Sequence, residues 1–149
     1  MAVSPYQPDD APDRFESGTM NMFGIAGLHA AVRFLLETGV ETVRAHEIEL
    51  MEMLLSSLRD IGNVTLYGPQ AASNRLGLVS FNIQDQDPYE IARKLDESHD
   101  IKVRAGLHCA PQAHRMVGTV NKGAVRVSLG YFNTKQDIDC FIEAVETLC

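Results

Sequence analysis

Hydrophobic residues along this chain follow helical spacing in the first part and alternate in the second. Apolar side chains recur every three or four residues from Met22 to a glycine at position 39, and again over 41–60, which predicts two consecutive helices. After residue 62 short apolar runs separated by turn residues predict strands. These runs cover 64–67, 78–83, 101–105 and 124–129.

Helical patterns separate several of these predicted strands. Asp87 and Pro88 form a helix start, a short helix is expected over 111–117, and Thr134 caps a last amphipathic helix. Two long helices followed by alternating strands and helices predict an α/β fold of the α+β sandwich type. We expect a small, mainly antiparallel sheet with helices packed on one face. Residues 1–14, rich in proline and aspartate, are expected to form an extended arm before one domain over 15–149.

Composition and charge narrow the possible partners. The chain has 149 residues and a net charge of −7, and it contains no run of lysine or arginine, so nucleic acid and anionic membranes are poor partners. No apolar stretch reaches the roughly 18 residues that span a bilayer. The first residues do not resemble a signal peptide, and three cysteines do not suggest a disulfide framework. We therefore expect a cytoplasmic protein.

The stretch Arg-Ala-Gly-Leu-His-Cys-Ala-Pro at 104–111 carries the strongest chemical signal. Cys109 comes three residues after a glycine and two before Pro111, and proline suits the first position of a helix. Cys109 is therefore expected on a loop at a helix entrance, where unpaired N–H groups favour the thiolate. A small buried residue in a tight turn would give the same local pattern, and the pattern does not decide between them.

Two arginines point away from the predicted core. In the strand over 124–129, the alternation places Arg126 opposite the apolar face, and Arg104 has the same position in the strand over 101–105. If these strands are neighbours, two guanidinium groups converge beside the cysteine loop and suit a substrate carboxylate. The alternative is that each arginine lies on a solvated face and pairs with an acid.

Histidines lie close to Cys109 in the sequence. His108 adjoins it and could transfer a proton or form an ion pair with the thiolate. Together with His114 the two residues also raise the question of zinc. Their spacings match no common zinc pattern, so a metal site is not expected.

Three segments resemble one protein family. The segment 104–111 and the following Gly-Ala-Val-Arg-Val-Ser-Leu-Gly-Tyr-Phe-Asn-Thr at 123–134 resemble the C-terminal region of cysteine desulfurases, in the class V aminotransferase branch of pyridoxal-phosphate enzymes. Arg-Phe-Glu-Ser-Gly-Thr-Met-Asn at 14–21 resembles a third motif of that family. The resemblance extends from about residue 12 to the end, with the motifs in the family's order.

The resemblance implies a role for each matching residue. Cys109 corresponds to the catalytic cysteine, which attacks the sulfur of an L-cysteine substrate bound to pyridoxal phosphate and leaves alanine and a persulfide. Arg126 corresponds to the arginine that binds the substrate carboxylate, and Arg104 to a second active-site arginine. Gly18 and Thr19 correspond to residues that, in the family's homodimer, reach the cofactor phosphate of the other subunit.

The chain also departs from the family pattern. Members are much longer, and a preceding large domain holds most of the cofactor. None of the four lysines (Lys94, Lys102, Lys122 and Lys135) has the family's Ser-x-His-Lys context for a Schiff base, and Leu107 stands where many relatives have histidine. We therefore expect the small C-terminal domain of such an enzyme, with little or no binding of pyridoxal phosphate and no turnover by itself.

Other functions remain open at this point. A selenocysteine lyase or another class V aminotransferase would keep the arginine pair and need the thiolate less. A stand-alone interaction or sulfur-carrier module would hold a persulfide on Cys109 and pass it to a sulfur-acceptor protein.

Overall fold

The computed structural model describes residue 6, residues 8–16 and residues 18–149. The chain divides into two compact units, Met1–Val40 and Glu41–Cys149, which we describe separately. The separation of an arm over 1–14 from a domain over 15–149 stays a prediction, and part of that arm lies outside the described residues.

The first unit contains a short 3-10 helix, η1 (Asp13–Phe15), and the long helix α1 (Met22–Thr38). The side chain of Asn21 caps the start of α1 by accepting the Gly24 N–H at 3.0 Å. Gly39 ends the helix with a φ of 85°, a conformation that glycine adopts without strain. These bounds agree with the prediction from sequence.

Within the first unit, the apolar side chains of α1 are exposed. None of the residues of this helix is buried, and Phe23, Leu28 and Leu36 are among its most exposed apolar side chains. The spacing therefore predicts the helix correctly, and within the first unit its apolar side chains stay largely exposed.

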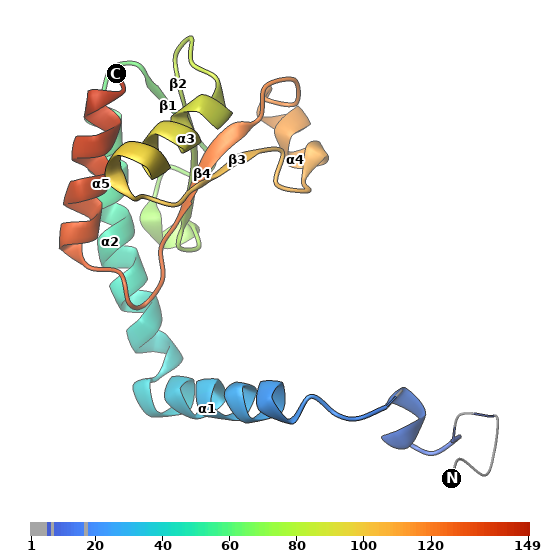
Figure 1. Cartoon of the computed structure of the whole chain (residues 1–149). Helices are drawn as coiled ribbons and strands as arrows, with labels where there is room; N and C mark the ends of the chain where they lie inside the picture. The colour runs from blue at the N-terminus through green and yellow to red at the C-terminus, as the bar shows by residue number, and fades with distance from the viewer. Residues whose placement is uncertain (1–5, 7, 17) are drawn as a thin grey trace. The chain divides into compact units, whose positions relative to one another are not determined.

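The second unit is built on a four-stranded sheet, in the order β1-β2-β4-β3, with every neighbouring pair antiparallel (Figure 1). Its strands are β1 (Val64–Tyr67), β2 (Leu78–Ile83), β3 (Arg104–Gly106) and β4 (Ala124–Ser128). This arrangement confirms the expected small antiparallel sheet.

Three helices supply the core of this unit: α2 (Val40–Asp60), α3 (Pro88–His99) and α5 (Lys135–Thr147). Their apolar stripes pack with the side chains that alternate toward one face of the sheet. The most buried members are Leu50, Leu54, Leu58, Val79, Phe81, Ile83, Ile91, Leu95, Val125 and Val145. Burying this apolar face is the main stabilising contribution to the unit, and it leaves the other sheet face for chemistry.

Helices α3 and α5 begin at the capping residues that the sequence predicts. The Asp87 side chain accepts the Tyr89 N–H at the start of α3, at 2.7 Å. Thr134 and Asp137 form a capping box at the start of α5.

One strand is shorter than the sequence predicts. The expected strand over 101–105 begins only at Arg104, and it extends to Gly106. The Ile101 N–H bonds the Leu95 carbonyl at 3.0 Å, so the chain is still tied to the end of α3 where a strand was expected. Two further elements complete the unit, the 3-10 helix η2 (Ala72–Asn74) and the short helix α4 (Pro111–Met116).

Within the described residues, no single helix is long and apolar enough to cross a membrane. Helices α1 and α2 pass such a test only as a pair, by length and composition.

Candidate functional site

Arg104 and Arg126 are direct partners across the β3–β4 ladder. Side chains at opposing positions of an antiparallel pair lie on the same face of the sheet. Because Val125 and Val127 face the core, both arginines belong to the opposite face. The expectation that the two strands are neighbours is confirmed.

Neither arginine has an acidic partner. Among the described residues, no carboxylate forms an ion pair with Arg104 or Arg126. The Nε atom of Arg126 is also buried without a hydrogen-bond partner. A buried, unpaired guanidinium nitrogen is costly in a folded protein, so this arrangement is suited to an anionic ligand rather than to a structural ion pair.

Cys109 lies on an exposed turn between β3 and α4. His108 has a φ of 53° and Cys109 a φ of 58°, so two consecutive non-glycine residues adopt the left-handed conformation. The Ala110 N–H closes the turn by bonding the Leu107 carbonyl at 2.8 Å. The thiol is therefore presented to the surface just before α4, as expected from Pro111, and it is not a buried turn residue.

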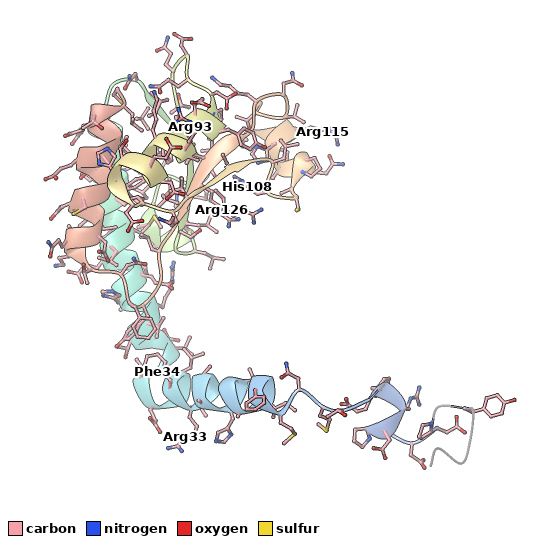
Figure 2. All side chains as sticks on the ribbon, viewed as in Figure 1. Arg33, Phe34, Arg93, His108, Arg115 and Arg126 are labelled. Atoms are coloured by element: carbon pink, nitrogen blue, oxygen red, sulfur yellow. The ribbon has the colours of Figure 1, made fainter. Side chains whose placement is uncertain are left out.

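His108 is held in one orientation beside the arginines. Its Nε2 atom lies 3.3 Å from the Arg104 carbonyl oxygen, which can only accept, so Nε2 carries the proton and Nδ1 keeps a lone pair. Burial lowers the pKa of His108 below its ordinary value, the hydrogen bond to the Arg104 carbonyl opposes this with a smaller effect, and the positive charges of Arg126 and Arg104 lower it further. The imidazole is therefore neutral at neutral pH and can accept a proton at Nδ1. Figure 2 shows His108 and Arg126 in the same part of the unit.

Two glycines allow the end of β3 and the start of β4 to lie very close together. A Cβ atom added to Gly123, whose φ is +78°, would lie 2.7 Å from the Gly106 Cα. Gly106 has a φ of +104°, and a Cβ there would collide with the Tyr89 hydroxyl. The end of β3 and the start of β4 can approach this closely only because both positions lack a side chain.

A buried amide supports the same region from beneath. The Asn82 Nδ2 atom donates to the Gly123 carbonyl at 3.0 Å and to the Tyr67 hydroxyl at 3.2 Å. Sequence alternation places Asn82 on the outer face of β2, but nothing local to that strand indicates that it holds a loop from residue 123.

His114 has a structural environment that the sequence did not reveal. It is buried in α4, its Nδ1 lies 2.7 Å from Thr119 Oγ1, and its ring centroid lies 5.6 Å from that of His108. No group of residues able to hold a metal occurs in the part of the chain that the structure describes. The only signal in the sequence for this contact is a histidine five residues after Cys109, which does not identify its partners.

A cavity opens on the sheet face that carries the arginines. Its volume is about 330 Å³, and Leu78, Ser80, Val117 and Thr119 are among the residues that line it. Ser80 is the direct cross-strand partner of Arg126. The cavity therefore begins one strand away from the arginine pair.

Gly18 and Thr19 belong to the first unit. Both are exposed, and nothing lies within 4 Å of the position that a Cβ of Gly18 would take. The structure therefore places Arg104, Arg126 and His108 close together, with Cys109 next to His108 on the exposed turn, while the predicted phosphate contacts at Gly18 and Thr19 stay a prediction.

The other two cysteines are exposed. Cys140 lies on the exposed side of α5. Its neighbour Phe141 takes the core position instead.

A model of the class V aminotransferases matches residues 2–141. The chain belongs to this family. Among curated relatives, a probable cysteine desulfurase of Methanothermobacter thermautotrophicus is 35% identical over 145 residues, covering 96% of this chain and 36% of that protein. A probable cysteine desulfurase of Halalkalibacterium halodurans is 39% identical over 137 residues, covering 92% of this chain and 32% of that protein.

Solved structures give the same result. The apo cysteine desulfurase of Thermococcus onnurineus superposes with a TM-score of 0.86 at 33% identity, covering 96% of this chain and 35% of that chain. A cysteine desulfurase of Escherichia coli gives a TM-score of 0.78 at 25% identity, covering 91% of this chain and 32% of that chain. The chain thus spans about a third of the length of these relatives, and the fold expected for the C-terminal domain of this family is confirmed.

Proposed function

We propose that this chain supplies the carboxylate-binding and sulfur-accepting residues of a pyridoxal-phosphate-dependent cysteine desulfurase. The observation that carries the proposal is the arginine pair: Arg104 and Arg126 lie opposite each other, with no acidic partner among the described residues, and β3 leads directly into the turn that presents Cys109. The similarity to cysteine desulfurases over most of this chain supports it.

Pyridoxal phosphate fits the described residues only in part. Gly18 and Thr19 would contact the phosphate of the cofactor held by the other subunit of a homodimer, because an exposed polar glycine loop suits an anion. Two of the four lysines are engaged elsewhere, Lys102 with Asp96 and Asp100, and Lys135 with Glu49. When bound in such an enzyme, the cofactor supplies the electron sink for cleavage of the carbon–sulfur bond.

The arginines bind and orient the substrate in this proposal. A guanidinium group can hold a carboxylate by two parallel hydrogen bonds, and Arg126 has a buried nitrogen without a partner. Arg104, on the same face, adds a second positive charge. Together they would fix the amino acid so that its side chain lies beside the Cys109 turn.

Cys109 accepts the sulfur. Its thiol proton passes to Nδ1 of His108, which the hydrogen bond from Nε2 to the Arg104 carbonyl leaves free. In the net reaction, L-cysteine and the Cys109 thiol give L-alanine and a Cys109 persulfide, so sulfur and hydrogen balance. A sulfur-acceptor protein and a homodimeric enzyme belong to this proposal, and so does the absence of turnover by the chain alone.

The proposal can be tested in a chimera. Residues 1–149 replace the matching region of the Methanothermobacter thermautotrophicus relative, and alanine and sulfide are measured with L-cysteine and a thiol reductant. We expect Cys109→Ala to abolish sulfide release while the absorbance of bound pyridoxal phosphate is unchanged. Cys140→Ala is the matched control, because Cys140 is equally exposed but lies on α5.

A chimera that binds the cofactor and releases sulfide normally with Cys109→Ala would contradict the proposal. Comparison of L-cysteine with L-selenocysteine as substrate separates a desulfurase from a selenocysteine lyase, which needs the thiolate less.

A further inference from the structure

We propose that His114 is a positioning residue that holds His108 and the Cys109 turn in place, through its ring contact with His108 and its hydrogen bond with Thr119. The functional meaning of this inference rests on the role proposed for Cys109. The contacts that carry it join the turn before α4, α4 itself and the loop that follows α4.

The turn needs support from outside. His108 and Cys109 both adopt the left-handed conformation, which is unfavourable for residues with a Cβ atom. Inside the turn, the Ala110 N–H bonds the Leu107 carbonyl. Such a turn persists where surrounding contacts hold it.

His114 provides a rigid contact on one side of the turn. It is buried, and its ring packs against that of His108 with centroids 5.6 Å apart and planes inclined at 49°. The bond between Nδ1 and Thr119 Oγ1, at 2.7 Å, fixes the rotation of the His114 ring. The same bond satisfies a polar atom of the buried ring, so the ring has a defined orientation where it meets His108.

Thr119 is itself anchored to the sheet. Its N–H bonds the His114 carbonyl at 2.8 Å, and its own carbonyl accepts the Gly123 N–H at 2.7 Å. Gly123 in turn lies against Gly106, the last residue of β3 before the turn. These contacts form a continuous network that joins the end of β3, the turn, α4 and the loop before β4.

Two substitutions interrupt this network while keeping a side chain of similar shape. Thr119→Val removes the hydroxyl, and His114→Phe keeps an aromatic ring but removes Nδ1. Thr119→Ser restores the hydroxyl. His46→Phe is the matched control, because His46 also makes a hydrogen bond, to the Asn133 carbonyl at 2.8 Å, and a ring contact with Tyr131, but on α2.

The readouts are amide hydrogen exchange and the titration of His108, both by NMR on this chain. We expect the Ala110 amide to exchange about tenfold faster in Thr119→Val and in His114→Phe. The buried Val125 amide of β4 reports global unfolding and should be unchanged. In Thr119→Val the pKa of His108 should rise toward its ordinary value as its ring becomes more solvated, while Arg104 and Arg126 remain in place. Thr119→Ser and His46→Phe should behave like the unmodified chain.

Unchanged Ala110 exchange and an unchanged His108 titration in Thr119→Val and His114→Phe would overturn the inference. Equal acceleration at Ala110 and Val125 would also overturn it, because the bond would then only stabilise the fold. These measurements use neither pyridoxal phosphate nor turnover. Failure of the proposed function, seen in the Cys109→Ala chimera, is therefore distinguishable from failure of this inference.

Discussion

Arg104 of β3 and Arg126 of β4 occupy directly opposing positions in the sheet, although both are cationic. Like charges at opposing positions of an antiparallel pair destabilise it, and the buried Nε of Arg126 lacks a partner. The fold therefore carries a local cost at the place where we propose that a substrate carboxylate binds. Such a cost is typical of functional sites, where selection favours binding over stability.

Removing one of these charges should stabilise the chain. We expect Arg126→Met to raise the free energy of unfolding by about 0.5–1 kcal/mol, because it removes the repulsion and the unpaired nitrogen. Urea denaturation of the chain measures this. Arg93→Met is the control, since Arg93 pairs with Glu90 and Glu97 and its loss should not stabilise. Destabilisation by Arg126→Met would show that Arg126 has a structural partner.

The close approach of Gly106 and Gly123 leads to a second prediction, which concerns stability. Gly123→Ala should lower the free energy of unfolding by about 2 kcal/mol or more, because of the positive φ and the contact with the Gly106 backbone. Gly62→Ala is the matched control, because nothing lies within 4 Å of its added methyl group. Equal effects of the two substitutions in thermal or urea denaturation would contradict this prediction.

The capping box of α5 predicts a dependence of stability on pH. The Thr134 N–H donates to Asp137 Oδ2 at 2.8 Å and lowers the pKa of Asp137 below its ordinary value of 3.8, with a smaller contribution from the Asn133 side chain. A carboxyl whose pKa is lowered by folding stabilises the fold above its ordinary pKa, and this contribution disappears as the pH falls through the lower, folded value.

Asp137→Asn should therefore destabilise the chain at about pH 6, and the difference from the unmodified chain should become smaller at about pH 3. Urea denaturation at both pH values measures it. Asp139→Asn, on the same helix but outside the capping box, is the control. A difference that stays constant with pH would mean that the Asp137 carboxylate does not contribute through its charge.

The exposed apolar side of α1 should cause self-association of the chain. Leu28→Glu combined with Leu36→Glu should shift the chain toward monomer, because both side chains are exposed on this helix. Light scattering after size-exclusion chromatography measures the mass. His29→Glu, on the same helix, is the control for added charge. If the double variant associates as strongly as the unmodified chain, the contact lies elsewhere.

Much of the fold could be predicted from local patterns. The bounds of β1 (Val64–Tyr67) and β2 (Leu78–Ile83) match the prediction to the residue, and α1 and α2 differ by at most one. Alternation and helical spacing reflect burial of one face, and the caps at Asp87 and Thr134 act through neighbouring N–H groups. These signals are local, so they can be interpreted without knowledge of the rest of the chain.

By itself, the sequence determined most of the secondary structure, the side of each strand that carries an arginine, and the position of a cysteine just before a short helix. The tertiary structure decided that Arg104 faces Arg126, that His114 packs on His108 with Thr119 behind it, and that β3 starts later than its apolar pattern. Arg104 and Arg126 meet only because two separate strands pair, and His108, His114 and Thr119 meet only because the turn and α4 fold the chain back on itself. Periodicity reports only which face of an element is buried, and it contains no information about which element covers it.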